Sequence, residues 1–384
     1  MKFDYDYIIC GGGAAGLSLA SGLSLDNSLS AKKILIIDPE YPKKNNDRTW
    51  CFWENNDSNI WEDLTFHNWN NVIFKSDLFN KVIPLKPLSY KMLKSISYYN
   101  YANNIISKNS NIKILNEKAL TILDKGNYGE VKTSSGIYKS QKVFNSILNW
   151  ELLKSNKKYP LLIQHFEGWF IKTEEDFFNP EEATFMDFSI EQNFNTKFMY
   201  ILPFSKKEAL VEYTLFSKNV LDKKGYETFL TNYLDSLGIK NYSIVSKESG
   251  RIPMTGFPFH KQNSKNIINI GSAGGWSKPS TGFTFKNIER KTKSLINFLK
   301  TNHDFTKFYK KSRFRYYDII FLDVLYQNNH LGKKLFTQMF KNNKSKWIFK
   351  FLDEKSNFFE ELTIMANFSI GIFVKTIFKR FFKL

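Results

Sequence analysis

The chain has 384 residues, and its 55 Lys and Arg against 37 Asp and Glu leave a formal net charge of +18 at pH 7. A chain of this length can bury a large core without disulfide bonds. Two Cys and five His, with no ligand-like spacing, argue against a zinc enzyme, so we expect no metal site. Aromatic residues make up 17% of the chain, a bias that suits a large apolar substrate or a membrane surface. The Lys residues are spread among Asn and Ser without a recognisable nucleic-acid-binding module, which argues against nucleic acid as a partner.

The beginning of the chain predicts a location inside the cell. Residues 1–6 lead directly into an apolar run, without the basic region, long apolar stretch and cleavage site of a secretory signal. No apolar stretch approaches the ~18 residues that a membrane-spanning helix needs. The best candidate, Ile364–Val374, is short and contains Asn367, Ser369 and Gly371. We therefore expect a cytoplasmic protein that is attached peripherally to the inner face of the membrane.

The first forty residues predict a dinucleotide-binding unit. Residues 6–10 have the pattern of a buried strand, and the glycine-rich turn Gly11–Gly16 follows. An apolar helix continues through Leu23, and a second strand at residues 33–38 ends in Asp38. A lone glycine motif is weak evidence, but a strand, a glycine turn, a helix, a strand and an acid in this order are strong evidence.

Each residue of this turn has an expected role. Gly11 allows the tight turn, Gly13 lets the backbone approach a pyrophosphate, and Gly16 permits close packing of helix and strand. Ala15, within the same turn, is counted among the cofactor-binding residues, and the N-terminus of the helix that follows would face the phosphate charge. Asp38 would accept hydrogen bonds from an adenosine ribose. The pattern by itself does not separate NAD from FAD.

A second glycine-rich turn favours FAD. Residues 266–270 have the pattern of a strand that enters this turn, and a helix of apolar and charged residues follows it. A cofactor that is held at two places must be long, so FAD fits better than NAD. Backbone N–H groups before the helix are expected to face the flavin ring or the ribityl chain. The expected binding residues of this segment are Gly271, Gly274, Gly275, Thr281 and Gly282.

Between the two turns, short strands predict a β-rich domain with two carboxyl groups in mid-strand. Alternation along residues 209–216 places Leu210, Glu212, Thr214 and Phe216 on one face. Desolvation among apolar neighbours would raise the pKa of Glu212 and keep it protonated, as a general acid requires. Asp187 lies in a similar apolar strand pattern. Spacing alone favours a buried structural carboxylate for each of them.

The end of the chain predicts a basic amphipathic helix. On a helical wheel of residues 373–384, the polar side chains Lys375, Thr376, Lys379, Arg380 and Lys383 share one arc, and mostly aromatic and aliphatic side chains fill the rest. Such a helix can lie on an anionic bilayer. The alternative is a terminal helix docked on the core with its charges in water, and we favour the membrane.

Six segments together resemble the flavoprotein lycopene cyclases of the bacterial and plant β-cyclase type. The resemblance covers about Tyr5 to Arg290, and the blocks around Arg48 and Glu212 are the specific ones. The six segments are the Gly11–Gly16 turn, Asn46-Asp47-Arg48-Thr49-Trp50-Cys51-Phe52-Trp53-Glu54, Phe185-Met186-Asp187-Phe188, Leu210-Val211-Glu212-Tyr213-Thr214, Arg251-Ile252-Pro253-Met254-Thr255-Gly256, and the Gly271–Phe283 segment.

The resemblance implies the reaction and the roles of several residues. Glu212 is implied to be the essential catalytic acid, Asp187 is assigned with it to the catalytic set, and Arg48 is assigned to the cofactor. The implied cofactor is reduced FAD, used without net redox change, with NAD(P)H as its reductant. The implied substrate is lycopene, converted through γ-carotene to β-carotene. Ser272 stands where related flavin hydroxylases often carry Asp, which favours a cyclase.

Cyclisation of a polyene passes through a carbocation, which electron-rich rings can stabilise. Candidates for an aromatic wall are Trp50, Phe52, Trp53 and Trp276, whose alternative role is ordinary core packing. Two other classes of function stay open: a redox flavoenzyme such as a reductase or monooxygenase acting on an isoprenoid lipid, and a non-catalytic lipid-binding relative. The sequence leaves undecided whether one or both ends are cyclised, β- versus ε-ring selectivity, tolerance of related acyclic carotenoids, the final proton acceptor and the oligomeric state.

The expected architecture is an α/β protein with a discontinuous, doubly wound Rossmann-like FAD-binding domain, a β-sheet substrate domain and a helical tail. The FAD-binding domain is expected to comprise residues 1–150, with small inserted segments, and to return at 256–300. The substrate domain is expected at 151–255. The basic, membrane-contacting tail is expected at 301–384, with helices over 304–326, 331–351 and the last residues.

Overall fold

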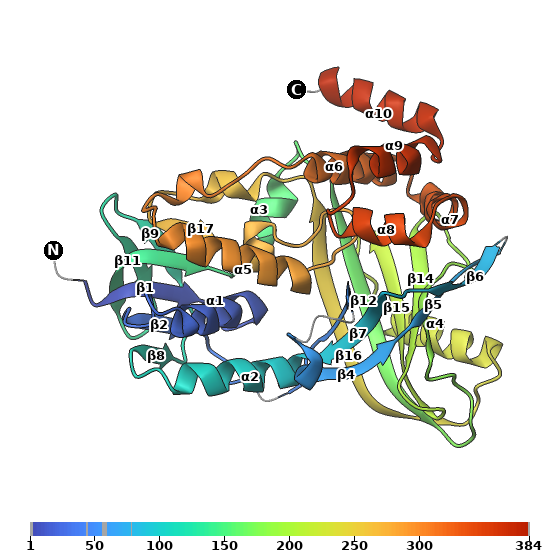
Figure 1. The fold of residues 1–384 in the computed structure, drawn as a ribbon, viewed down its shortest axis with the longest axis horizontal. Helices are drawn as coiled ribbons and strands as arrows, with labels where there is room; N and C mark the ends of the chain where they lie inside the picture. The colour runs from blue at the N-terminus through green and yellow to red at the C-terminus, as the bar shows by residue number, and fades with distance from the viewer. Residues whose placement is uncertain (1–2, 44, 56–59, 78, 383–384) are drawn as a thin grey trace. The chain divides into compact units, whose positions relative to one another are not determined.

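The computed structural model describes residues 3–43, 45–55, 60–77 and 79–382 (Figure 1). By its internal contacts the chain divides into two compact units, both discontinuous in sequence. Mixed parallel and antiparallel sheets with helices confirm the predicted α/β fold class. The first unit comprises Met1–Trp50, Lys94–Tyr159 and Gly256–Ser312, and the second comprises Cys51–Leu93, Pro160–Thr255 and Arg313–Leu384.

The first unit is built on a seven-stranded sheet with the order β8-β2-β1-β11-β10-β9, in which β17 also pairs with β11. Strand β1 runs parallel to its neighbours β2 and β11, while β9 and β10 form an antiparallel edge. The apolar side chains Ile8 and Ile9 are fully buried, as expected for a central parallel strand. The strands are β1 (Tyr5–Cys10), β2 (Ile34–Ile37), β8 (Ile112–Leu115), β9 (Thr121–Asp124), β10 (Gly129–Lys132), β11 (Ile137–Asn145) and β17 (Ile267–Asn269).

Helices of the first unit accompany this sheet (Figure 1). Helix α1 follows β1 directly and contacts both α2 and α5. The predicted strands at 6–10, 33–38 and 266–270 and the helix after Gly16 are therefore present, each with ends shifted by a few residues. The helices are α1 (Ala14–Leu25), α2 (Ser95–Ser107), α3 (Trp150–Ser155) and α5 (Phe285–Leu299), with short 3-10 turns η2 (Phe259–Gln262), η3 (Gly271–Gly274) and η4 (Phe305–Lys307).

The second unit is built on another seven-stranded sheet, with the order β16-β12-β15-β14-β13-β5-β6. All neighbours are antiparallel except β13 and β5. A three-stranded sheet with the order β3-β7-β4 adds to it. The strands are β3 (Thr49–Asn55), β4 (Thr65–Trp69), β5 (Asn71–Ser76), β6 (Phe79–Pro84), β7 (Leu88–Lys94), β12 (Leu161–Thr173), β13 (Glu182–Asp187), β14 (Thr196–Pro203), β15 (Glu208–Ser217) and β16 (Tyr242–Thr255), and the turn η1 spans Glu62–Leu64.

The two faces of the large sheet are covered differently. Helix α4 (Lys223–Ser236) packs on one face, where Tyr213 and Leu215 of β15 join its apolar side chains. The other face carries Phe216, whose ring contacts Phe336 of α7 at 6.3 Å. The predicted alternation along β15 is thus present in the structure, and it separates Glu212 from the core beneath α4.

Two boundaries differ from the expected domains. Residues 51–93 belong to the second unit, because β5 pairs with β13 and β3, β4 and β7 form their sheet there. The tail from residue 313 belongs to the same unit, because α6 packs on β12 and β16 and α7 packs on β5 and β14. The chain up to residue 312 remains with the first unit.

The tail contains five helices among the described residues, more and shorter than expected. The first begins at Arg313, since residues 304–312 form only the turn η4 and a loop, and the second is interrupted near Asn343. Within the described ranges, no single helix is long and apolar enough to cross a membrane, although α9 and α10 meet that test jointly as a pair bent by 109°. The helices are α6 (Arg313–Gln327), α7 (Gly332–Asn342), α8 (Ser345–Leu352), α9 (Phe358–Ala366) and α10 (Ile370–Phe382), and the turn η5 spans Asn329–Leu331.

Candidate active site

The first glycine turn has the shape expected of a pyrophosphate-binding loop. Gly11 adopts a φ of +100°, which favours glycine. A Cβ on Gly16 would lie 1.9 Å from the Gly11 carbonyl oxygen, so only glycine lets helix and strand pack this closely. A Cβ on Gly13 would meet no atom within 4 Å, which leaves open space at the start of α1. The helix has no side-chain cap and no acidic residue in its first turn, so its N–H groups are not opposed by an acidic side chain there.

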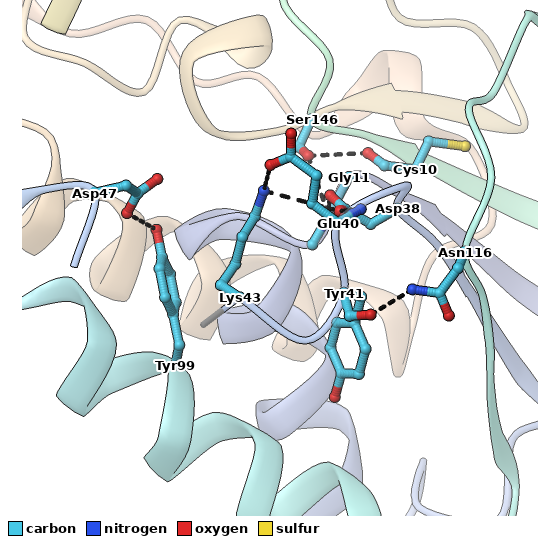
Figure 2. A network of polar contacts seen from close by, with 11 residues as sticks. Cys10, Gly11, Asp38, Glu40, Tyr41, Lys43, Asp47, Tyr99, Asn116 and Ser146 are labelled. Carbon is cyan, nitrogen blue, oxygen red and sulfur yellow. Dashed lines mark hydrogen bonds and ion pairs between the residues drawn. The ribbon is translucent and has the colours of Figure 1, made fainter. Parts of the chain in front are cut away.

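Asp38 at the end of β2 is tied to this turn (Figure 2). Its Oδ2 accepts a hydrogen bond from the Gly12 backbone N–H at 2.7 Å, and its Oδ1 accepts one from the Glu40 N–H at 2.8 Å. Lys43 Nζ lies 3.9 Å from Oδ1. These bonds hold the carboxylate against the glycine turn, and a carboxylate has further lone pairs with which to accept ribose hydroxyls.

The second glycine turn lies against the first within the same unit. A Cβ on Gly271, whose φ is +58°, would lie 2.7 Å from the Cβ of Ala15 in α1. A Cβ on Gly274 would lie 2.2 Å from the Asn269 carbonyl oxygen, and Gly275 has a φ of +67° beneath the ring of Phe259. The structure therefore brings together the two turns that the sequence separates by about 255 residues, as one long cofactor held at two places requires.

One detail of the expected cofactor contacts is wrong. The Gly282 N–H donates to the Lys278 carbonyl at 2.8 Å, and the Thr281 N–H approaches the same oxygen at 3.3 Å, because the segment closes its own turn. These N–H groups are therefore not free for a flavin. Among the residues that the structure describes, Thr281 instead offers a buried hydroxyl oxygen without a hydrogen-bond partner.

These features fit a dinucleotide with a long second half. The space at Gly13, the carboxylate at Asp38 and the unpartnered Thr281 hydroxyl are the three local observations that support the fit. Arg48 is an exposed residue whose backbone N–H donates to Ser95 Oγ at 3.1 Å, and it lies in the same unit as both glycine turns.

Glu212 lies in the middle of β15, in the second unit. The residue is half-buried by its accessible surface, and protein atoms surround its carboxyl group densely. A reactant can therefore reach the carboxyl, although water does not fully solvate it. The pKa of Glu212 is raised to about 8, mainly by burial and also by the carboxyl of Glu248, while a hydrogen bond from Thr214 opposes this shift. That bond runs from Thr214 Oγ1 to Glu212 Oε1 at 2.6 Å. Glu212 is therefore mainly protonated at neutral pH, as expected for an acid.

The strand register explains how Glu248 comes close. Glu212 on β15 and Glu248 on β16 are both paired with Gly168 of β12, the strand between them. A Cβ on Gly168 would lie 3.4 Å from Glu212 Cβ and 3.4 Å from Glu248 Cγ. The glycine thus leaves room for the two side chains to converge over it. On the other side, Tyr200 of β14 is paired with Glu212.

Rings surround this row of residues within the second unit. Phe185 lies 6.2 Å from Tyr200, 5.5 Å from Tyr90 and 6.3 Å from Trp53, measured between ring centroids. Phe349 of α8 contacts both Trp53 and Phe185, at 5.0 and 5.9 Å. Trp53, one of the predicted aromatic residues, thus belongs to a group of rings in the same unit as Glu212.

The four candidates for the aromatic wall are divided between the two units. Trp50 belongs to the first unit, where it stacks on Phe285 at 5.2 Å. Trp276 also belongs to the first unit and is buried. Phe52 is buried in the second unit, together with Trp53. The aromatic wall stays a prediction, because its candidates belong to two different units.

Asp187 lies on the face of the large sheet opposite to Glu212. Its carboxyl accepts hydrogen bonds from Tyr233 Oη at 2.9 Å and from the backbone N–H and hydroxyl of Ser189 at 2.8 and 2.5 Å. Lys75 Nζ lies 3.5 Å away. This is the environment of a structural carboxylate that anchors α4 to the sheet. The structure does not bring Asp187 to Glu212, and we assign it no step below.

Sequence reasoning missed Gly168, Tyr200 and Glu248. Strands β12 and β16 were not recognised, because β12 is buried along nearly all its length and half of β16 is exposed, so neither shows clean alternation. The Glu-Ser-Gly sequence at 248–250, directly before a recognised motif, was the one available signal. Among the described residues, no group of three His, Cys, Asp or Glu side chains could hold a metal ion.

The Rossmann-like unit with two adjoining glycine turns and the large, mostly antiparallel sheet of the second unit form a fold that solved reductase-like, monooxygenase and halogenase structures share. The chain belongs to the lycopene cyclase family: the family model described as "Lycopene cyclase protein" matches residues 6–378. The family predicted from the motifs is thus confirmed, and the match extends through the tail. Comparison with the curated proteins finds no match.

Solved structures with low sequence identity share the fold. A geranylgeranyl bacteriochlorophyll reductase-like protein from Thermoplasma acidophilum is 12% identical, with a TM-score of 0.61 over 98% of this chain and 99% of that one. A variant of halogenase PltM in complex with FAD is 11% identical, with a TM-score of 0.62 over 97% and 85%. The p-nitrophenol 4-monooxygenase PnpA from Pseudomonas putida DLL-E4 is 12% identical, with a TM-score of 0.58 over 100% and 98%.

Proposed function

We propose that this protein is a lycopene β-cyclase, in which Glu212 protonates the terminal alkene of lycopene. Protonation produces a tertiary carbocation, the neighbouring double bond attacks it, and loss of a ring proton yields the β-ionone ring. Repetition at the other end leads from lycopene through γ-carotene to β-carotene. The observation that carries this proposal is a carboxyl at position 212 that stays protonated at neutral pH and is still accessible.

An alkene is a very weak base, so its protonation needs an undissociated acid in a poorly hydrated place. Burial of Glu212 supplies this condition, and the Thr214 hydroxyl orients the carboxyl through Oε1. A hydrogen bond received at Oε1 leaves Oε2 to carry the proton to be donated. The neighbouring rings of Tyr200 and Phe185 offer electron-rich faces to a developing cation.

We infer that the first unit holds FAD, with Gly11, Gly13 and Gly16 at the pyrophosphate, Asp38 at the ribose and Thr281 further along the cofactor. Reduced FAD, when bound, would supply negative charge that stabilises a cation without net electron transfer, and NAD(P)H would be its reductant. The chain's own residues then bind and orient the two ligands and deliver the proton.

The substrate is a hydrocarbon, so its binding depends almost entirely on burial of apolar surface, at about 25 cal/mol per Å². The abundance of Phe in the chain and the rings around Glu212 supply such surface. A redox flavoenzyme acting on an isoprenoid lipid would also need an apolar site, but it would not need a protonated carboxyl there. This difference favours the cyclase.

The test is expression in a host that accumulates lycopene, with wild type and Glu212→Gln side by side. We expect wild type to produce β-carotene, and the variant to bind FAD normally while losing cyclisation by a factor on the order of 10³. Consumption of NAD(P)H in proportion to product would instead identify a redox enzyme. Retained cyclisation in the variant would refute the role of Glu212.

We also propose that helices α9 and α10 attach the protein to an anionic bilayer. Helix α10 faces the rest of its unit with polar side chains and with Phe373: Thr376 is buried, Arg380 Nη1 lies 2.6 Å from Asp323 of α6, and the ring of Phe373 lies 6.4 Å from that of Phe321. Its outward stripe is apolar, with exposed fractions of 57% for Ile370, 42% for Val374, 60% for Phe378 and 87% for Phe382. A helix docked in water would have the opposite orientation.

The same part of the unit carries further cationic side chains and exposed aromatic ones. A pocket of about 520 Å³ between α6 and α10 is lined by Lys218, Lys375 and Lys379. In α9, Phe358 and Phe359 are exposed as well. Lysines beside exposed apolar side chains match the interface of an anionic leaflet, which attracts each cation by about 1 kcal/mol. Attachment to the inner face of the membrane would place the protein where carotenoids dissolve.

A further inference from the structure

The face of the large sheet that carries Glu212 has a second carboxyl in the same row. Glu212 and Glu248 flank Gly168, and each lies within 3.4 Å of the point where a side chain on that residue would begin. Strand β12 lies between β15 and β16, and a side chain on it would normally separate residues of the two outer strands. Glu212 and Glu248 can converge because both are paired with the same residue of β12 and that residue is a glycine. Glu248 itself is buried.

We propose that Glu248 is a positioning residue that keeps the Glu212 carboxyl in its acid form, through their convergence over Gly168. This inference rests on the proposed function and deepens it, because it assigns the control of the donated proton to a second residue. Two carboxylates whose side chains converge in a poorly solvated environment repel each other, so one of them retains its proton.

Other titratable groups near Glu212 do not supply this charge. They are Cys51 of β3, Tyr90 of β7 and Tyr200 of β14. Burial raises the pKa of the Cys51 thiol and of both phenols well above neutrality, so all three stay uncharged at physiological pH. Within this described set, Glu248 is the group that can bear a negative charge beside Glu212.

The geometry also gives the chain a matched control. Glu167, on the same strand as Gly168, is a buried carboxyl that accepts a hydrogen bond from Trp169 Nε1 at 2.8 Å. Trp169 belongs to the core beneath α4, so Glu167 points to the opposite face from Glu212. Glu248→Gln and Glu167→Gln therefore remove the same group from the two faces of one sheet.

The test is an infrared titration of the holoprotein without substrate. The absorption band of a protonated carboxyl that is present in wild type and absent from Glu212→Gln belongs to Glu212, and its intensity is followed as the pH is changed. We expect Glu248→Gln to move this titration to lower pH by on the order of one pH unit, and Glu167→Gln to leave it in place. Should Glu248→Gln not fold, Glu248→Asp is expected to move it in the same direction by less, since its carboxyl is one methylene shorter. An unchanged titration in the folded variant overturns the proposal.

Cyclisation provides a separate readout. Activity requires protonated Glu212, so the upper pH limit of cyclisation should fall in Glu248→Gln by the same amount as the titration does. A chain that cyclises no carotenoid, but whose Glu212 titration still responds to Glu248, would refute the proposed function and leave the pairing intact. If the chain cyclises carotenoids normally and replacement of Glu248 does not change the Glu212 titration, the proposed function stands and the role of Glu248 is refuted.

Discussion

Replacement of Glu212 by Gln should stabilise the protein while it abolishes cyclisation. The folded-state pKa of Glu212 is about 8, against an ordinary value of 4.5. Between these two values, the unfolded chain ionises this carboxyl and the folded protein does not, so the stability that is fully present below pH 4.5 is lost progressively as the pH rises to 8. A neutral amide carries no such penalty.

The magnitude follows from the two pKa values. At pH 7 the penalty amounts to about 3 kcal/mol, and at pH 5 it is below about 1 kcal/mol. Both are upper limits, because the accessible part of the carboxyl is screened by solvent. The hydrogen bond from Thr214 is expected to survive, since a glutamine carbonyl accepts it as the carboxyl did.

Urea unfolding of the holoproteins at pH 5 and pH 7 provides the measurement. The gain of Glu212→Gln over wild type should grow between the two pH values. A Glu212→Gln variant that is no more stable than wild type at pH 7 would contradict the raised pKa on which the proposed acid depends.

Three further outcomes are expected. Gly16→Ala should eliminate FAD binding, measured by flavin absorbance after purification, because its methyl group would overlap a backbone oxygen, whereas Gly136→Ala, which meets no atom within 4 Å, should bind FAD normally. Phe378→Glu should weaken co-sedimentation with anionic vesicles by at least about tenfold, and Leu25→Glu, at another exposed apolar residue, should not; equal binding of both would argue against α10 as the attachment site. Asp187→Asn should lower the free energy of unfolding by about 1–3 kcal/mol without changing the pH profile of cyclisation, and a changed profile would return Asp187 to the catalytic set.

The sequence by itself determined the local features whose signals lie within a few residues. The strand, turn and helix at residues 5–25 depend on glycines at positions where the backbone conformation or close packing excludes other residues. The roles of these glycines could therefore be assigned from the sequence. The same holds for alternation along β15, which correctly predicted the face that Glu212 shares with Thr214. Family membership followed from short motifs of this kind, and the match to residues 6–378 confirms it.

Tertiary structure decided everything that depends on which strands are neighbours. Glu248 reaches Glu212 only because β12 inserts Gly168 between β15 and β16, and no spacing along the chain encodes that register. The same cause separates Asp187, which looked equivalent in sequence, since pairing turns it toward α4. Helix α10 presents its apolar stripe outward, while Arg380 and Phe373 contact α6 on its other side. The helical wheel described the two faces but could not say which one would meet solvent.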